Sequence, residues 1–352
     1  EDPAIFNPEH LNTHQWVRVA KETGFKTMIL TAKHHDGFCL WPSKFTDHSV
    51  EASPWRNGEG DVVRELVEAA AENLKIGLYL SPWDRHEPTY GEQTAYNEYY
   101  IGQLRELLTG YGDLHEVWLD GAKGEDAKDM DYNFHTYWGL VRQLQPEAVM
   151  FSDEGPDVRW IGNERGIAGD PCWSMMDRSR VTVGKADQDY LNHGDINGPD
   201  WVPGESDVSI RPGWFWHEDE QLKSVSELMD IYYKSVGRNT VLLLNVPPND
   251  QGLLSRVDVT RLYEFKAARD KIFGVDFTVD AAADADNIRG NSQEYSPKLT
   301  LDGQLDTFWA TEDAVRSATL EITLNEPETF NVIRIQEPIA WGQRVKSYHV
   351  DV

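Results

Sequence analysis

Short apolar runs alternate with amphipathic stretches along the first 272 residues, and this alternation constrains the fold more than any other feature. The strand-like runs lie at residues 26–32, 76–80, 114–119, 148–152 and 241–245. The helix-like stretches lie at residues 12–23, 61–73, 95–108, 133–144, 221–236 and 257–272. Strands that alternate with helices through short linkers are typical of βα units and a parallel sheet. We therefore predict an α/β chain.

Polar and aromatic residues follow the strand-like runs directly. They occur at residues 33–36, at 82–86 with Trp83 among them, at 120–121 and at 152–154. A (β/α)8 barrel places its active site at this end of its strands. No Gly-x-Gly-x-x-Gly follows the first run, which weakens a dinucleotide-binding alternative. We predict a (β/α)8-like (TIM) barrel over residues 1–272. A helix precedes the first run, so this barrel is expected to lack its first strand.

The pattern changes near Gly274. Residues 320–324 and 331–335 alternate between apolar and polar side chains, and no long helix is evident beyond residue 273. Period-two alternation in short segments is typical of a β-sandwich. We predict a second domain over residues 273–352, a β-sandwich that is itself incomplete.

Composition excludes several classes of partner. Lys and Arg number 33 against 60 Asp and Glu, a net charge of −27 that repels phosphate backbones and disfavours a nucleic-acid partner. No apolar run approaches the ~18 residues of a membrane span. Two cysteines, Cys39 and Cys172, make neither a disulfide scaffold nor a Cys-based metal site. The 13 Trp and 14 Tyr fill a core or stack on sugar rings.

Two adjacent histidines, His34 and His35, end the first strand-like run. Neighbouring side chains on a strand point to opposite faces, so such a pair rarely binds one metal ion unless the backbone turns. We predict no metal site and no cofactor. Hydrogen bonding to a polar substrate is favoured, and a purely structural role stays open.

Candidate catalytic carboxylates follow the later strands. Asp120 ends the third run, where a barrel carboxylate faces the ligand, although it could also cap the next helix. Glu164 lies in a loop with Trp160 and could pair with Asp120 as the two carboxylates of a glycosidase. The competing partners are Glu154, Glu205 and Asp207. Residues 209–217, which include Arg211 and Trp214, form an aromatic loop that could line the site or pack in the core.

Three separated motifs resemble those of the α-L-fucosidases of glycoside hydrolase family 29. They are Lys33-His34-His35-Asp36-Gly37-Phe38, Trp118-Leu119-Asp120-Gly121 and the segment 239–248. The resemblance implies a (β/α)8-like barrel and a retaining mechanism. It also implies that Asp120 is the nucleophile and that His34 and His35 bind the sugar. We predict further substrate contacts from Trp83, Trp118, Trp160, Arg211 and Trp214.

Two other segments refine this expectation. Residues 155–166 resemble the family branch that removes α-1,3- and α-1,4-linked fucose from Lewis-type glycans, in which the acid/base corresponds to Glu164. Residues 301–309 resemble a discoidin-like, galactose-binding sandwich.

The sequence thus predicts a retaining exo-α-L-fucosidase acting on a fucosylated oligosaccharide. The alternatives are a non-catalytic fucose-binding protein on the same scaffold and a barrel glycosidase for another sugar, such as a β-galactosidase or hexosaminidase. No signal peptide is visible at Glu1-Asp2-Pro3, yet a glycan substrate favours an extracytoplasmic location, whether periplasmic, cell-surface or secreted.

Overall fold

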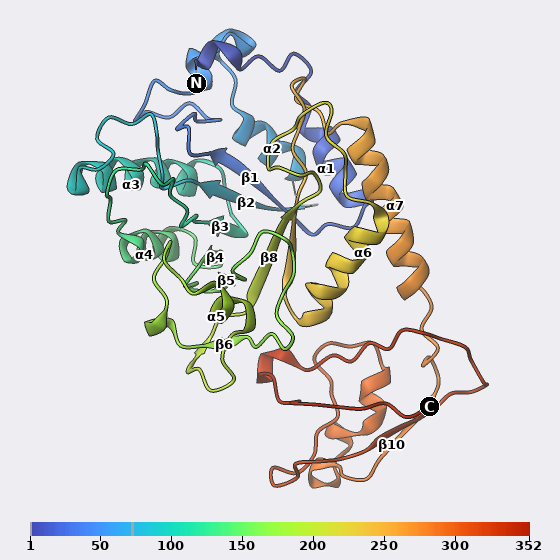
Figure 1. Ribbon diagram of the computed structural model, residues 1–352. Coiled ribbons are helices and arrows are strands. Elements are labelled where there is room, and N and C mark those ends of the chain that lie inside the picture. Colours follow the sequence, from blue (N-terminus) through green and yellow to red (C-terminus); the bar gives the residue numbers. More distant parts are fainter. Residues whose placement is uncertain (1, 72–73) are drawn as a thin grey trace. The chain divides into compact units, whose positions relative to one another are not determined.

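The computed structural model describes residues 2–71 and 74–352, which fall into two compact units. The first unit ends at Lys266 and the second spans Ala267–Val352. The division therefore lies inside helix α7 (Arg256–Phe273), whereas the sequence pattern placed it after residue 272. Each unit is described by itself below (Figure 1).

A single seven-stranded parallel sheet forms the centre of the first unit, in the order β1-β2-β3-β4-β5-β8-β9 (Figure 1). The strands are β1 (Thr27–Lys33), β2 (Lys75–Leu80), β3 (Glu116–Trp118), β4 (Val149–Ser152), β5 (Val158–Trp160), β8 (Gly204–Ser209) and β9 (Val241–Asn245). A small antiparallel pair, β6 (Met175–Met176) and β7 (Asp200–Trp201), lies in the segment between β5 and β8. All five strands predicted from apolar runs are confirmed.

Two strands of this sheet, β5 and β8, were not predicted. β5 has only three residues. β8 reads Gly-Glu-Ser-Asp-Val-Ser, yet all six of its residues are buried. Strand recognition from sequence relies on apolar or alternating side chains, and β8 offers neither pattern. Its buried carboxyl groups become important below.

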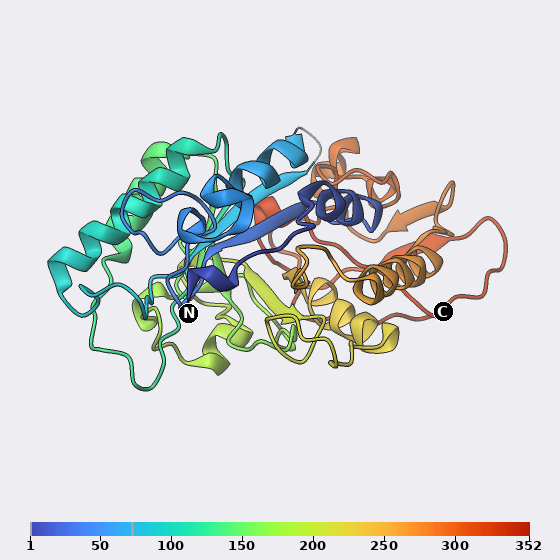
Figure 2. The same cartoon turned by 90° about the horizontal axis from the view of Figure 1, so that it is seen from above.

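Helices connect the strands and lie outside them in both views (Figure 1, Figure 2). They are α1 (Thr13–Glu22), α2 (Val62–Ala70), α3 (Gln93–Gly110), α4 (Phe134–Leu144), α5 (Gln188–His193), α6 (Val225–Lys234) and α7. Local signals explain where several begin, because Asn12, Asp61, Asn133 and Ser224 each accept a backbone N–H bond as N-caps. The predicted end of the second helix, Asn73, lies outside the described residues.

The sheet is curled. Trp118 on β3 and Glu205 on β8 are separated by two intervening strands, yet the indole Nε1 lies 2.8 Å from the Glu205 Oε1. Such a contact requires the strands to wrap around a shared interior, with the helices outside. This architecture is consistent with a (β/α)8 barrel. Within the described residues, however, β1 and β9 are end strands, so a closed barrel is not formed.

The second unit contains one antiparallel pair, β10 (Ala282–Ala285) and β11 (Leu320–Thr323). β11 confirms the strand expected at 320–324. The strand expected at 331–335 is wrong, because those residues adopt no regular structure. Ile333 and Ile335 are 51% and 53% exposed, so little burial of apolar surface stabilises a strand there. Of the expected sandwich, the described residues form this one pair.

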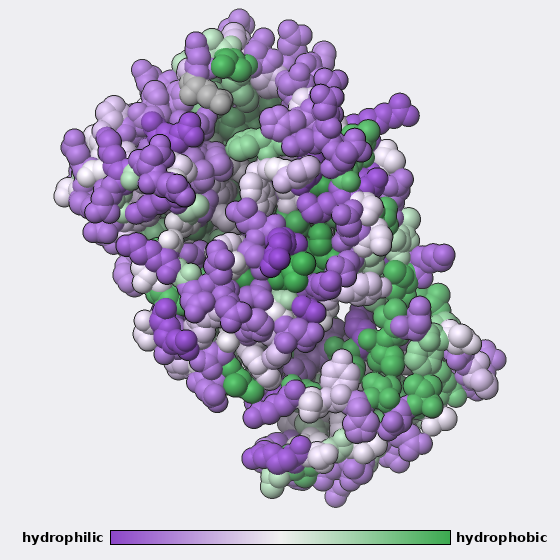
Figure 3. Space-filling view, viewed as in Figure 1, coloured by the Kyte–Doolittle hydropathy of each residue, from purple (hydrophilic) through white to green (hydrophobic). Residues whose placement is uncertain are grey.

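The surface is hydrophilic, as the 26% of charged residues in the sequence leads one to expect. The face drawn in Figure 3 is predominantly hydrophilic, with its largest group of apolar side chains at the lower right. In the part of the chain that the structure describes, every helix is too short or too polar to cross a membrane.

Candidate active site

Asp120 lies just beyond the carboxyl end of β3, with a side chain that is 17% exposed. The Tyr79 phenol donates a 2.7 Å hydrogen bond to its Oδ2, and the Ala122 backbone N–H donates a 2.8 Å bond to its Oδ1. Nε2 of His35 lies 3.8 Å from Oδ2. The alternative role as a helix cap is excluded, because Asn133 caps α4. Each carboxylate oxygen therefore has one donor and keeps lone-pair capacity toward solvent.

His34 and His35 follow β1 directly, and their rings lie together, with centroids 3.9 Å apart. The alternation of a strand does not apply to this pair, because β1 ends at Lys33 and the chain turns there. The Gly37 N–H bonds the His34 carbonyl at 3.0 Å in this turn. His35 Nδ1 pairs with the Ser81 hydroxyl at 2.8 Å, which fixes the ring whose Nε2 faces Asp120.

Both histidines are neutral near pH 7. Burial, with a smaller contribution from the adjacent His35, lowers the pKa of His34 to about 4. Burial also lowers the pKa of His35, although Asp120 opposes that shift. A neutral imidazole offers one donor and one acceptor nitrogen, which matches a sugar hydroxyl better than it matches an anion.

Aromatic side chains surround this cluster. The Trp83 ring lies 4.7 Å from His35, and Gly124 leaves the space that Trp83 fills, because a Cβ there would overlap the indole. Trp118 stacks on Phe151 at 3.9 Å with an interplanar angle of 10°. Flat rings beside polar groups suit the apolar face of a sugar.

Glu164 is exposed in the loop after β5, and its Oε2 accepts a 3.1 Å hydrogen bond from the Trp214 indole. Trp214 belongs to the loop after β8, where Asn245 Nδ2 donates to its carbonyl at 2.9 Å. The structure thus brings two separated predicted residues into contact.

Two competing carboxyl groups are enclosed by the sheet. Glu205 and Asp207 are only 2% and 3% exposed, and Asp207 accepts a 2.9 Å bond from the indole of Trp160. Burial, opposed by the hydrogen bond from Trp160 and aided by the charge of Glu164, raises the pKa of Asp207 to about 8. Neither buried group is open to a glycosidic oxygen. Glu154 is half-buried and stays a competitor.

Arg211 does not face the cluster around Asp120. It is 1% exposed, and its guanidinium contacts Asp258 at 2.9 and 3.2 Å and donates to the His217 carbonyl at 2.8 Å. Its donors are thus directed inward, toward a buried carboxylate and the backbone of its own loop. The expected substrate contact from Arg211 is therefore replaced by a structural role.

Sequence reasoning missed Tyr79 and the Lys33–Asp84 ion pair. Tyr79 is the fifth residue of β2 and lies inside an apolar run, where the pattern predicts a core side chain. The Lys33 Nζ lies 2.9 Å from Asp84 Oδ2, with both side chains buried. Asp84 also accepts the backbone N–H groups of His86 and Glu87 at 2.9 Å each. This buried pair fixes the loop that carries Trp83.

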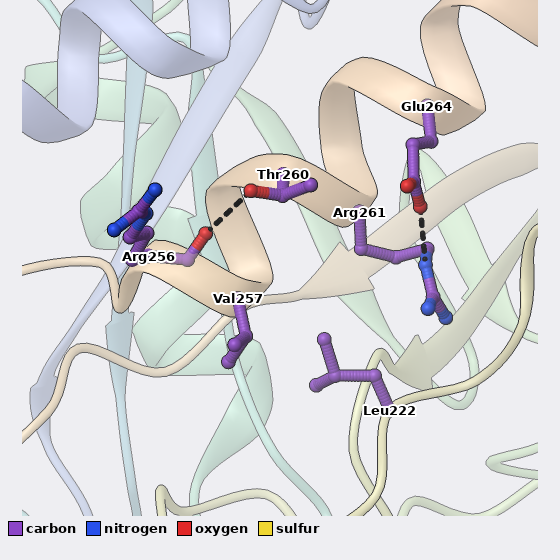
Figure 4. Close-up of a pocket in the computed structure, with 6 residues that line it drawn as sticks. All are labelled: Leu222, Arg256, Val257, Thr260, Arg261 and Glu264. Atoms are coloured by element: carbon purple, nitrogen blue, oxygen red, sulfur yellow. Dashed lines mark hydrogen bonds and ion pairs between the residues drawn. The ribbon is translucent and has the colours of Figure 1, made fainter.

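A separate cavity of about 230 Å³ lies against α7 (Figure 4). Arg261 in its lining pairs with Glu264 at 2.9 Å, and Thr260 bonds the Arg256 carbonyl. It contains none of the predicted site residues and no aromatic ring, so the cluster around Asp120 stays the candidate active site.

Comparison with known proteins identifies the family of both units. The family model "Alpha-L-fucosidase" matches residues 3–267, and the "F5/8 type C domain" matches residues 282–352. Alpha-L-fucosidase 1 of Arabidopsis thaliana is 53% identical over 352 residues, which cover 99% of this chain and 70% of that protein.

Solved structures agree as well. SpGH29 superposes with a TM-score of 0.88 at 45% identity, over 93% of this chain and 74% of that one. A GH29 fucosidase of Ruminococcus gnavus, solved in complex with fucose, gives 0.82 at 34% identity, over 92% and 71%. This chain therefore belongs to the α-L-fucosidases of glycoside hydrolase family 29 and carries an F5/8 type C domain after its strand-and-helix unit.

Proposed function

We propose that this protein is a retaining exo-α-L-fucosidase that removes α-1,3- and α-1,4-linked fucose from Lewis-type glycans outside the cytoplasm. The observation that carries the proposal is the Asp120 carboxylate. It is held by Tyr79 at the end of β3, beside two neutral histidines. The fucose complex of the R. gnavus relative supports fucose as the sugar.

In the first step, Asp120 attacks the anomeric carbon while Glu164 protonates the departing glycosidic oxygen. A covalent β-linked fucosyl-enzyme results. In the second step, Glu164 acts as base, and water displaces Asp120 with a second inversion, so that the product keeps its α configuration. The Trp214 indole donates to Glu164 Oε2 and would orient this acid/base.

His34, His35 and Trp83 bind and orient the sugar in this mechanism. The neutral imidazoles hydrogen-bond fucose hydroxyls, and the Trp83 ring covers an apolar face. Orientation matters because an anomeric carbon that is displaced by about 1 Å from the nucleophile costs about 10²-fold in rate.

An aryl α-L-fucoside tests the activity and the mechanism together. We expect steady turnover, with α-L-fucose as the first anomer seen by NMR immediately after mixing. Aryl β-galactosides and β-N-acetylhexosaminides serve as matched controls and should not react. β-L-Fucose as the first product would disprove retention. Fucose binding without turnover would identify a binding protein instead.

Linkage preference is the second expected outcome. The loop with Glu164 contacts the loop with Trp214 through the Glu164–Trp214 bond, so a galactose beside the fucose has an aromatic surface to contact. Remote contacts of this kind stabilise the transition state. We expect Lewis-type trisaccharides to show kcat/KM at least about 10-fold above that of α-1,2-fucosyl-galactose, or ~1.4 kcal/mol. Faster release from the 1,2-linked disaccharide would reject the linkage assignment.

A further inference from the structure

Strand β8 places Glu205 inside the curled sheet, where it is 2% exposed, and the proposed mechanism does not use it. A carboxyl group buried in this way is costly unless it is neutral or well bonded. Its contacts therefore indicate what it does.

Two residues of β3 contact Glu205. The Trp118 indole donates to Glu205 Oε1 at 2.8 Å, and the carboxyl group of Glu116 lies close enough for its charge to raise the pKa of Glu205. Glu116 and Trp118 are two positions apart on one strand, so both side chains point to the same face. Gly77, the partner of Glu116 on β2, leaves room for it, because a Cβ at Gly77 would lie 3.1 Å from the Glu116 Cβ.

Burial favours the protonated form of both carboxyl groups. Burial raises the pKa of Glu116 to about 7, and burial together with the Glu116 charge raises the pKa of Glu205 well above its usual range. A protonated Glu205 donates its O–H to Glu116 while its carbonyl oxygen accepts the indole N–H. Both bonds then form at once.

Trp118 connects this pair to the nucleophile. Its ring lies 5.3 Å from the Tyr79 ring, and it is stacked on Phe151 on the other strand beside β3. The Tyr79 phenol donates to Asp120. The position of the indole therefore limits where Tyr79, and through it Asp120, can lie.

We propose that Glu205 is a positioning residue that holds the Trp118 indole from inside the sheet, so that Tyr79 keeps Asp120 aligned for attack. The inference rests on the proposed fucosidase function. Glu205 touches neither the sugar nor the reacting atoms, and it acts through Trp118.

Four variants of the intact protein test this, with aryl α-L-fucoside kinetics as the readout. Glu205→Leu should lower kcat/KM about 10-fold to 100-fold, mainly through kcat, because it breaks the bond to Trp118. Glu205→Gln should stay within about 3-fold, because an amide keeps both a donor and an acceptor. Trp118→Phe keeps an aromatic ring but removes the N–H, so it should resemble Glu205→Leu. The double variant Glu205→Leu/Trp118→Phe should have a kcat/KM no lower than that of Trp118→Phe alone.

Glu106→Leu is the matched control. It breaks another indole–carboxylate bond, 3.0 Å from Trp41 Nε1 to Glu106 Oε2, and should change the melting temperature without changing kcat/KM. A kcat/KM of Glu205→Leu that is as little changed as that of Glu106→Leu would overturn the proposal. So would loss in Glu205→Gln equal to that in Glu205→Leu, or additive effects in the double variant.

Failure of the underlying function gives a different pattern. A wild-type protein that releases no fucose disproves the fucosidase assignment, and the same variants are then compared by calorimetric affinity for L-fucose. Weakened binding in Glu205→Leu but not in Glu205→Gln still supports the positioning role, and equal affinities reject it. If Glu205→Leu does not fold, an unchanged kcat/KM in Trp118→Phe overturns the proposal.

Discussion

Replacement of Asp120 by glycine is expected to lower kcat for aryl α-L-fucosides by about 10⁴-fold or more, which is ~5.4 kcal/mol of transition-state stabilisation. The variant lacks the nucleophile, so even a good leaving group does not depart. Its fold should persist, because Asp120 lies at a strand end with a partly exposed side chain. Added azide should then displace the aryl group directly, with one inversion, and give β-fucosyl azide by NMR.

The control for this variant is Asp113→Gly, which changes an exposed aspartate at the opposite end of β3. It should retain wild-type kcat and a similar melting temperature. Substantial turnover by Asp120→Gly without azide would show that Asp120 is not the nucleophile.

Replacement of Glu164 by alanine should have a different kinetic signature. Natural glycans need protonation of a poor leaving group, so their turnover should fall about 10²-fold to 10⁴-fold. An aryl fucoside needs little protonation, and its first step should persist. The fucosyl-enzyme then accumulates for lack of a base, visible as a burst of aryl alcohol and as a mass increase on the intact protein.

Azide again separates the two roles. It needs no base, so it should attack the accumulated intermediate of Glu164→Ala and give α-fucosyl azide after two inversions. Glu147→Ala, an exposed glutamate before β4, is the matched control and should behave as wild type. Normal activity of Glu164→Ala on glycans would move the acid/base role to Glu154. Glu205 and Asp207 are both too buried to take it.

Much of the fold and part of the site could be predicted from local patterns. The five apolar runs became strands because each reads as a buried segment of a parallel sheet regardless of what surrounds it. The position of Asp120 could be predicted in the same way, because a polar residue just after such a run lies at the carboxyl end of the sheet. N-caps such as Asn133 act within one turn and therefore need no tertiary information.

Other features depend on segments far apart in the chain. β8 contains two carboxyl residues and looks like a polar loop until the curled sheet encloses it against β3. Arg211 beside two tryptophans looks like a wall of the site until Asp258, 47 residues later, binds its guanidinium inside the protein. Tyr79 reads as an ordinary core residue of a strand, and only its position beside Trp118 and Asp120 identifies it as a residue of the site.

The sequence by itself determined five of the seven strands of the sheet, the end of the sheet that carries the chemistry, and the identity of Asp120 and the histidine pair as candidates. These follow from side-chain periodicity and short-range capping, which are properties of a few neighbouring residues. Only the tertiary structure decided which carboxyl groups are open to solvent and which are enclosed. Exposure depends on what the curl of the sheet brings across the interior, and no local pattern encodes that distance.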